Sequence, residues 1–560
     1  MQTVENIRPW MTSDVINLYE GQVIAGVAIA YDLLHNDLIP EERERFIAIG
    51  REYFLKPFLR NTAPGRNMRE HGERGSWWFG TINNWNPVCI SGGGMLALTM
   101  YEHLPEAQTA IDRVFASYQP IFDYLEDTRG GWIEGLGYWN WTLHYMSLFL
   151  RSYERATGTE HAGFRSTGFR NGLTFGTYFL ANGEACGFGD NQHGRFSHSL
   201  LAAAEHLGDD YAFRRLQDHF LLQDEVHQIK EETRRMRKAD IDESSADVLV
   251  AVENISYGLP QHVLLAPDLP ADYEIRTDAN MVRYFPRMGW GMVADVWPRP
   301  NVYGAIRSGK SLGSHAHHDF LTWHGVVGME RMVQTINEAG YYDTAWQRRA
   351  YEIYERSPAA KNTLFIGGLS PYRGTPPSAR GRAQPDPISL QLPTGPALVV
   401  DATIAMWLTR NNPRLVRRMI TTVDDRGLLL LDRVLGRGSN PVEARLHTNK
   451  DYEAGESSVV LRGEFEVARL TFAADQPAIL RHNQAMLTNA RATPPTVFRW
   501  QTLDRVRDVV LATFLSRGEE PVDLLVTSDE KGVTVSMQGD GWEHHLHLTD
   551  SLELRPDHAE

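Results

Sequence analysis

Asparagine amides alternate with tryptophans in the first of three clusters whose residue types could do chemistry. The cluster is Trp77–Cys89, and it contains the run Asn83-Asn84-Trp85-Asn86. Amide donors beside an aromatic wall can bind the hydroxyls and the carboxylate of a sugar acid. The same residues also suit a loop between helices in which each asparagine bonds its own backbone. The glycine run that follows, Ser91–Gly94, lacks the Gly-Lys-Ser/Thr ending of a phosphate loop.

The second cluster, Asp127–Trp141, has glycines that open a loop and aromatic residues that follow them. An aromatic stripe at helical spacing is usually core, but Glu134 within this stripe is hard to bury without a polar partner. Glu134 lies four residues before Tyr138, so the two share a face if both are helical. The pattern indicates the start of a helix that lines a pocket, with Glu134 and Trp139 as candidate substrate contacts.

The third cluster, at residues 307–320, carries His315 and His317. In an extended chain these two imidazoles would project to the same side, as a proton-transfer pair, as two ligands of a metal ion, or as a structural pair. Arg307 could bind a substrate carboxylate, and a surface arginine is the alternative. His193, in a polar glycine-rich loop, is a further candidate contact with substrate, with an ordinary Asx turn as the alternative.

Two kinds of element must position these clusters. From about residue 13 to the 250s, apolar residues recur at intervals of three and four, which predicts amphipathic helices. From about Tyr273 onward, short β-branched and aromatic runs alternate with turn residues, and Met419–Val423 and Leu428–Val434 predict a hairpin. A proline-rich connector lies at 258–270. We therefore expect a helical domain over 1–265 and an antiparallel β-sandwich over 266–560, with the option of a small C-terminal β subdomain from about 475.

The composition excludes several classes of protein. The chain has 560 residues, which favours more than one domain, and its two cysteines, Cys89 and Cys186, cannot form a disulfide framework. The formal net charge of -15 opposes non-specific binding to nucleic acid or to an anionic membrane. The sequence has neither an apolar run of membrane-spanning length nor a secretion signal after Met1, so a cytoplasmic location is expected. The oligomeric state stays open.

Together the clusters resemble the heparinase II/III-like polysaccharide lyases over most of the chain. The resemblance implies an incomplete (α/α) toroid followed by an antiparallel β-sandwich. Because Tyr19-Glu20-Gly21 lies close to Met1, the first part of the usual toroid is expected to be missing, so either the toroid is short or Met1 is an internal start. The motifs that carry the resemblance, in the order of the family, are Asn83–Asn86, Glu134–Trp139, Ser314–Asp319, Glu338–Tyr342 and Lys361–Thr363.

The resemblance implies β-elimination on a polysaccharide or oligosaccharide that contains 4-linked uronic acid. Such a lyase neutralises the uronate carboxylate, removes the C5 proton and expels the 4-linked sugar. By resemblance, Asn84 neutralises the carboxylate, while Tyr138 protonates the leaving oxygen and, as a phenolate, is also the base of a syn elimination. His315 is either the base of an anti elimination or a second carboxylate neutraliser. The expected substrate contacts are Asn83, Trp85, Asn86, Glu134, Trp139, His193, Arg307 and His317.

One departure from the family concerns metal. Some relatives bind a structural zinc ion through three positions that read His317, Glu338 and Lys361 in this sequence. An ammonium group has no lone pair to offer a metal ion, so we expect no zinc and no other cofactor. We expect Lys361 to act instead as a permanent cation that pairs with Glu338 and leaves His317 free to contact substrate.

Two other classes of protein fit parts of the pattern. A glycoside hydrolase on a helical toroid would need two carboxylates flanking the scissile bond, such as Asp127 or Glu134 together with Asp190. An inactive glycan-binding relative would keep the aromatic residues and lose the proton-transfer set. That set is retained, which favours a lyase whose site is completed across the interface between the two domains.

Overall fold

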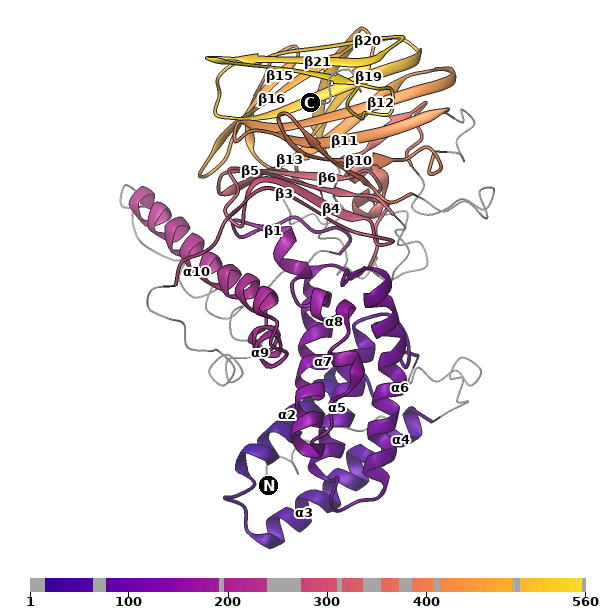
Figure 1. The fold of residues 1–560 in the computed structure, drawn as a ribbon, viewed down its shortest axis with the longest axis vertical. Coiled ribbons are helices and arrows are strands. Elements are labelled where there is room, and N and C mark those ends of the chain that lie inside the picture. Colours follow the sequence, from indigo (N-terminus) through magenta and orange to yellow (C-terminus); the bar gives the residue numbers. More distant parts are fainter. Residues whose placement is uncertain are drawn as a thin grey trace.

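The computed structural model describes residues 16–63, 77–190, 196–238, 273–309, 315–335, 354–371, 385–406, 413–485, 487 and 494–555. Within these residues, a helical region precedes a region of antiparallel strands, and the two are stacked along the long axis of the molecule (Figure 1). The expected fold class, an incomplete toroid followed by an antiparallel sandwich, is confirmed. The expected boundary between residues 265 and 266 lies outside the described residues.

Long helices in the N-terminal region pack through glycine. A Cβ atom on Gly92 would lie 2.2 Å from the carbonyl oxygen of Gly21, so only glycine allows this approach between α2 and α5. The glycine run therefore serves helix packing. No helix of the described residues is long and apolar enough to cross a membrane. The helical elements are α2 (Leu18–Leu34), α3 (Pro40–Gly50), the π-helix η2 (Arg51–Leu55), α4 (Lys56–Asn61), α5 (Trp85–Thr99), α6 (Glu106–Asp127), α7 (Leu136–Thr157), η3 (Ala162–Phe164), α8 (Thr167–Gly172), η4 (Phe175–Phe179), α9 (His198–His206) and α10 (Asp210–Lys238).

Antiparallel sheets make up the second region. A five-stranded sheet contains β3 (Asp278–Phe285), β4 (Trp290–Trp297), β5 (Val302–Arg307), β6 (Trp323–Val327) and β7 (Glu330–Val333) in that order. An eight-stranded sheet has the order β14 (Asp451–Ala454), β15 (Ser458–Arg462), β16 (Val467–Ala474), β19 (Val506–Arg517), β12 (Gly427–Asn440), β11 (Leu415–Val423), β10 (Gly395–Asp401) and β9 (Ile388–Leu392). The predicted hairpin is confirmed as β11 and β12, with Val423 opposite Gly427.

Smaller sheets complete this region. Four strands have the order β17 (Ala478–Gln484), β18 (Thr496–Thr502), β13 (Val442–Thr448) and β8 (Leu364–Ile366), and three have the order β20 (Asp523–Asp529), β21 (Gly532–Gly539) and β22 (Trp542–Leu548). The short pair β1 (Leu180–Ala181) and β2 (Glu184–Ala185) follows η4. Of the strands described after residue 475, β19 lies inside the eight-stranded sheet and β17 and β18 lie in the four-stranded sheet, while β20, β21 and β22 form a sheet of their own.

The core of the helical region continues into the five-stranded sheet. Phe175 packs edge-on against Phe285, with ring centroids 4.8 Å apart, and Phe179 packs edge-on against Trp290 at 5.1 Å. These residues belong to one hydrophobic cluster that spans both regions. Because this shared core excludes water, the orientation of the toroid on the sheet is fixed by packing.

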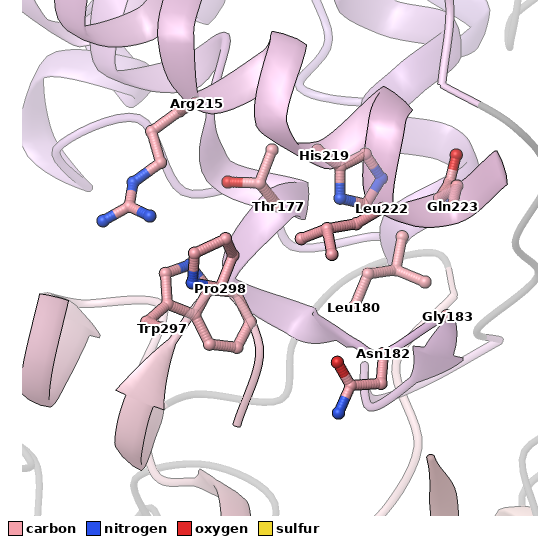
Figure 2. Close-up of a pocket in the computed structure, with 10 residues that line it drawn as sticks. All are labelled: Thr177, Leu180, Asn182, Gly183, Arg215, His219, Leu222, Gln223, Trp297 and Pro298. Atoms are coloured by element: carbon pink, nitrogen blue, oxygen red, sulfur yellow. The ribbon is translucent and has the colours of Figure 1, made fainter. Parts of the chain in front are cut away.

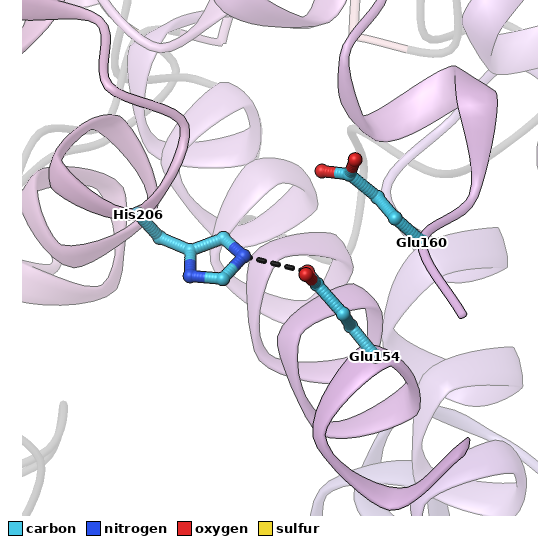
Figure 3. A group of neighbouring side chains, drawn as sticks. All are labelled: Glu154, Glu160 and His206. Atoms are coloured by element: carbon cyan, nitrogen blue, oxygen red, sulfur yellow. Dashed lines mark hydrogen bonds and ion pairs between the residues drawn. The ribbon is translucent and has the colours of Figure 1, made fainter. Parts of the chain in front are cut away.

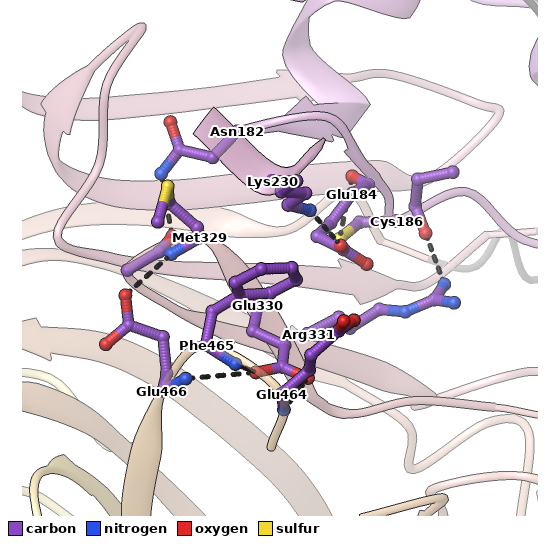
Figure 4. Close-up of polar contacts among 12 residues, drawn as sticks. Asn182, Glu184, Cys186, Lys230, Met329, Glu330, Arg331, Glu464, Phe465 and Glu466 are labelled. Atoms are coloured by element: carbon purple, nitrogen blue, oxygen red, sulfur yellow. Dashed lines mark hydrogen bonds and ion pairs between the residues drawn. The ribbon is translucent and has the colours of Figure 1, made fainter. Parts of the chain in front are cut away.

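A second contact joins α10 to the sandwich, and Figure 4 shows Lys230 of α10 near the turn that carries Glu464 and Phe465. Arg234 donates from Nε and Nη2 to the two carboxylate oxygens of Glu464, at 2.9 and 3.1 Å. The next ring, Phe465, lies under the cations of Lys230 and Arg234, at 5.5 and 5.6 Å from its centroid. The buried carboxylate of Glu330 accepts hydrogen bonds from the backbone N–H groups of Glu464 and Phe465, at 2.9 and 2.8 Å. Glu330 therefore fixes the turn at Glu464 and Phe465, and α10 packs on that turn.

Candidate active site

Asn84 occupies the N-cap position of α5 without using its side chain as a cap. Its backbone N–H donates to Oε2 of Glu134 at 2.6 Å, and the residue is only 1% exposed. Neither atom of its side-chain amide has a hydrogen-bond partner among the described residues. Leaving a buried amide unpaired costs free energy. An acceptor or donor supplied by a ligand would remove that cost.

Asn86, two residues later, uses its amide inside the protein. Its Nδ2 donates to the carbonyl oxygens of Thr81 and Ser117, at 3.0 and 2.8 Å, and its Oδ1 accepts from the Ser117 hydroxyl at 2.6 Å. Its backbone N–H donates to Oδ1 of Asn83 at 3.3 Å. We expected Asn86 to contact substrate, but its amide is bonded within the protein and stabilises the loop that carries Asn84.

The two tryptophans expected at the substrate have different environments. Trp85 is half-buried and lies against the exposed ring of Trp77, with centroids 5.1 Å apart. These two rings form an aromatic surface beside Asn84. Trp139 is fully buried and donates from Nε1 to the carbonyl oxygen of Gly172 at 2.7 Å. The structure thus differs from the expectation for Trp139, whose ring completes the core of the helical region.

Tyr138 and His315 come from the two different regions and stack on each other. Tyr138 lies in the first turn of α7, which begins after Gly135 at a φ of 111°. His315 lies in the segment between β5 and β6. Their ring centroids are 3.9 Å apart and their planes differ by 20°. Nε2 of His315 lies 3.9 Å from Oε1 of Glu134, the carboxylate that also accepts from Asn84. Glu134 therefore contacts both Asn84 and His315, and Tyr138 joins this group through its stack on His315.

Asp190 is the main partner of His315, and the sequence had singled it out only for a hydrolase. Its Oδ2 accepts from Nδ1 of His315 and from Nη2 of Arg356, each at 2.9 Å. Its Oδ1 accepts from Nε2 of His317 at 2.6 Å. Burial opposes the charge of Asp190, but the hydrogen bonds from both histidines and the charge of Arg356 outweigh it and hold the pKa of Asp190 well below its usual range. Asp190 is thus an ionised acceptor, and both ring nitrogens that face it carry hydrogens.

The backbone of Gly189 and Asp190 lies close to the backbone of His315. Its N–H donates to the carbonyl oxygen of His315 at 2.9 Å. The preceding residue, Gly189, has a φ of 75°, and a Cβ atom there would lie 2.5 Å from that same oxygen. The N–H of Gly189 donates to Oδ2 of Asp319 at 2.9 Å. Only glycine allows the Asp190 loop to approach His315 so closely.

His317 does not have the free ring that the sequence led us to expect. It is fully buried, and while Nε2 bonds to Asp190, Nδ1 lies 2.9 Å from Nζ of Lys361. Burial, together with the charge of Lys361, lowers the pKa of His317 to about 4. Burial also lowers the pKa of Lys361 to about 8, against the opposing charges of Asp319 and Asp190. With both ring nitrogens bonded and an ammonium beside one of them, these residues do not fit a zinc ion.

Arg307 also has a partner within the protein. Its Nε lies 3.0 Å from Oδ1 of Asp319, and both side chains are buried. The guanidinium lies over Trp290, 5.6 Å from the ring centroid. A buried carboxylate needs a cation, so the expected contact of Arg307 with a substrate carboxylate is replaced by this internal pair. The remaining expectations, His193 as a substrate contact and Glu338 as a partner of Lys361, concern residues outside those that the structure describes.

Two further features of the described residues lie apart from this site. A small pocket between α10 and the end of β4 is lined by Arg215, His219 and Trp297 among others (Figure 2), and none of the expected catalytic residues lines it. Glu154, Glu160 and His206 have potential ligand atoms within 4.8 Å of one another (Figure 3). That group is partly exposed, and its Glu154 and His206 already bond each other at 2.6 Å.

Sequence reasoning did not assign a catalytic-site role to Asp190 in a lyase, and it did not identify Arg356. The polar glycine-rich loop that carries Asp190 was a visible signal. Its partners could not be read from spacing, because His315 is 125 residues away and Arg356 is 166 residues away along the chain.

Comparison with known proteins adds a family and a fold. Residues 277–536 match the family model described as heparinase II/III-like, C-terminal. No curated protein matches the sequence significantly. A mutant heparan sulfate lyase from Pedobacter heparinus superimposes with a TM-score of 0.58 at 10% identity, over 85% of this chain and 66% of that one.

Two heparinase III structures are similar to the same extent. One has a TM-score of 0.58 at 13% identity, over 83% of this chain and 67% of that one, and the other has a TM-score of 0.54 at 13% identity, over 81% and 65%. The chain therefore spans about two thirds of the length of these structures. At such identities the likeness establishes the arrangement of a helical region followed by β domains.

Proposed function

We propose that the chain, whose residues 277–536 match the heparinase II/III-like C-terminal family model, is a polysaccharide lyase that cleaves a 4-linked, uronic-acid-containing glycan by β-elimination. The observation that carries the proposal is that Glu134 contacts both Asn84 and His315, while the ring of Tyr138 stacks on His315. Asn84 and Tyr138 come from the helical region and His315 from the sheets, so the site exists only in the assembled molecule.

The amide of Asn84 is suited to the carboxylate of the substrate. Negative charge flows into the C6 carboxylate as the C5 proton leaves, and a preorganised donor stabilises that charge without reorganising. The amide is buried and unpaired among the described residues, so its hydrogens are already desolvated before the substrate binds. The substrate would supply the missing acceptor.

The stacking of Tyr138 on His315 supports a syn elimination. A pyranose ring does not fit between rings whose centroids are 3.9 Å apart, so the two side chains approach the sugar from one side. In the proposed reaction, the phenolate of Tyr138 takes the C5 proton, the C5–H electron pair forms the C4–C5 double bond, and the C4–O bond breaks. The same proton then passes from Tyr138 to the departing oxygen, so no other acid is needed.

His315 then has an electrostatic role. A phenolate forms near neutral pH only beside positive charge, because the ordinary pKa of tyrosine is about 10. His315 as an imidazolium would supply that charge, with Nδ1–H bonded to Asp190 and Nε2–H directed at the substrate carboxylate. Its Nδ1 and Nε2 lie 2.9 and 3.9 Å from carboxylate oxygens of Asp190 and Glu134, so the ring is held between the two groups.

The hydrolase alternative has less support. A hydrolase needs two carboxyl groups that reach the scissile bond, one as acid and one ionised. Both oxygens of Asp190 already accept hydrogen bonds inside the protein, from His315, His317 and Arg356. Asp127 is exposed and paired with Arg287 at the surface. Of the three candidate carboxylates, only Glu134 is then left to act on a substrate.

The decisive experiment is a screen for the unsaturated product. The purified protein would be mixed with alginate, heparan sulfate, hyaluronan and glucuronate-containing oligosaccharides, and the ultraviolet absorbance of the conjugated double bond would be followed. We expect a rise with at least one uronide, and none with the Tyr138→Phe variant, which keeps the ring stack and lacks the hydroxyl. Release of reducing sugar without any rise in absorbance would favour hydrolysis and contradict the proposal.

A further inference from the structure

Two buried histidines compete for one carboxylate in this protein. Asp190 accepts a hydrogen bond from His315 through Oδ2 and from His317 through Oδ1, at 2.9 and 2.6 Å. Either imidazole could in principle take a second proton and become the ion-pair partner of Asp190. Only His315 stacks on Tyr138, so the location of that proton matters for the reaction.

Lys361 distinguishes the two histidines. Its Nζ lies 2.9 Å from Nδ1 of His317, and the side chain is fully buried. An ammonium group can only donate, so Nδ1 of His317 must accept, and the single ring proton of His317 must lie on Nε2, facing Asp190. The environment of His315 differs, because its two ring nitrogens face the carboxylates of Asp190 and Glu134.

We propose that Lys361 is a positioning residue that holds His317 as the neutral ring with its hydrogen on Nε2, so that His317 does not neutralise Asp190 and Asp190 is left to orient His315. The ammonium excludes a second proton from His317 in two ways: it occupies the lone pair of Nδ1, and its charge repels that of an imidazolium. The consequence for catalysis rests on the lyase function proposed above, while the assignment of the proton rests on the contacts alone.

The other charges around the chain of contacts fit this assignment. Arg356 donates to Oδ2 of Asp190, on the side of His315, and Asp319 and Glu355 contribute negative charge that favours the protonated form of Lys361. The ammonium thus has carboxylates near it to keep it charged. Three hydrogen bonds connect Lys361 to His317, His317 to Asp190, and Asp190 to His315. Through them the ammonium group of Lys361 influences the ring that stacks on Tyr138.

The first test reads the histidines directly. Protein labelled with ¹⁵N-histidine would be studied by NMR at neutral pH, with His315→Gln and His317→Gln used to assign the signals. In the native protein we expect His317 to show one protonated nitrogen, Nε2, and one unprotonated nitrogen. An imidazolium at His317 in the native protein overturns the proposal, whether or not any variant folds.

The second test removes the cation. In Lys361→Met we expect His317 to gain the second proton or to lose its fixed tautomer, and we expect kcat to fall by about 10- to 100-fold, as is usual when a residue that orients a reactive group is lost. Lys361→Arg retains a permanent cation and should largely restore both readouts. A native-like His317 spectrum in Lys361→Met would contradict the proposal.

A double-mutant cycle separates this role from simple structural support. Glutamine at position 317 can donate from Nε2 to Asp190, as histidine does, but an amide cannot take up a proton. The kcat penalty of Lys361→Met should therefore disappear in the His317→Gln background. An undiminished penalty would show that Lys361 acts through charge balance or folding instead.

The matched control is another lysine largely buried in an ion pair. Lys450 pairs with Glu330 in the sandwich, away from the site. Lys450→Met should lower the melting temperature without changing the signals of His315 or His317.

If the native protein gives no unsaturated product with any uronide while the NMR results hold, the proposed function fails and the proton assignment stands. If the native protein is an active lyase but His317 is unchanged in Lys361→Met, the proposed function stands and the role of Lys361 fails.

Discussion

Two asparagines of the same loop have opposite roles, although they lie only two residues apart. The amide of Asn86 makes three hydrogen bonds inside the helical region, whereas the amide of Asn84 makes none among the described residues. Buried amides are normally satisfied, so the unpaired amide of Asn84 supports the proposed contact with substrate.

Asn84→Ala should therefore lower kcat by about two to three orders of magnitude, the usual effect of losing one donor to a developing anion. Asn84→Asp should lower it further, because a carboxylate opposes the charge of the transition state. Product absorbance with the best uronide measures both effects. The melting temperature should change little for Asn84→Ala.

Asn86→Ala is the matched control for this prediction. It removes an amide that bonds Thr81 and Ser117, so we expect a loss of about 1–3 kcal/mol in the free energy of unfolding, measured with urea. If Asn84→Ala destabilises the protein as much as Asn86→Ala does, the amide of Asn84 has a structural role that contradicts its assignment to substrate.

At the scale of elements, a loop and a helix start bring the reactive groups together. Gly135 turns the chain into α7 and sets Tyr138 in its first turn. Gly189 allows the loop before Asp190 to press against the backbone of His315. Both glycines have positive φ values, 111° and 75°, which side chains with a Cβ atom rarely adopt.

Gly189→Ala should disrupt the site through its backbone. The substitution forces a Cβ atom to within 2.5 Å of the carbonyl oxygen of His315, in addition to the left-handed conformation itself, which costs about 1–2 kcal/mol. We expect both a lower melting temperature and a lower kcat. Gly208→Ala is the control, since Gly208 has a φ of 62° and open space around it. A kcat loss of the same size in both variants would refute the close-approach argument.

At the scale of the whole molecule, the site depends on how the helical region sits on the sheets. The shared aromatic core and the contact between α10 and the sandwich fix that orientation. Asn182 adds two hydrogen bonds across the boundary, from its Nδ2 to the carbonyl oxygens of Pro300 and Gly328, at 2.9 and 2.7 Å.

Asn182→Gly should loosen this boundary. Asn182 has a φ of 48°, which glycine adopts readily, so the variant removes the two hydrogen bonds without straining the turn. We expect a loss of about 1–3 kcal/mol in the free energy of unfolding and a parallel fall in kcat/KM. Unchanged kcat/KM in a destabilised variant would mean that the site does not depend on these bonds.

Buried imidazoles should make the folded protein sensitive to acid. Burial lowers the pKa of His219 and of His447 to about 3. An unfolded imidazole titrates near pH 6.5, so below that value the unfolded chain binds more protons than the folded chain. The stability contributed by these neutral rings is complete above about pH 6.5 and is lost as the pH falls toward the folded values.

His219→Phe tests this linkage at one position. His219 stacks on Phe196 with centroids 4.4 Å apart, and its Nε2 has no partner among the described residues, so phenylalanine keeps the stack and removes the proton. The pH dependence of the unfolding free energy below about pH 6.5 should weaken by up to about 1.4 kcal/mol per pH unit. The exposed His103 provides the control, His103→Gln, which should leave the slope unchanged.

Periodicity and motif order were sufficient to predict the fold class and the β11–β12 hairpin, because the repeat of apolar residues reflects one buried face of each element. Residue type alone could not tell Asn84 from Asn86, or a substrate contact from the core ring of Trp139. Arg307 and His317 were expected at the substrate, and both have buried partners within the protein instead. These distinctions depend on burial, which local sequence does not specify.

The sequence by itself determined which chemical groups are available: an amide beside tryptophans, a tyrosine at a helix start, a pair of histidines, and a lysine where relatives have a metal ligand. Only the tertiary structure decided which groups meet. Asp190 reaches His315 across 125 residues and Lys361 reaches His317 across 44, because the packing of the helical region on the sheets brings their loops together. The proton positions on His317 follow from those contacts, since an ionised carboxylate on one side of the ring and an ammonium group on the other leave only one arrangement of its hydrogens.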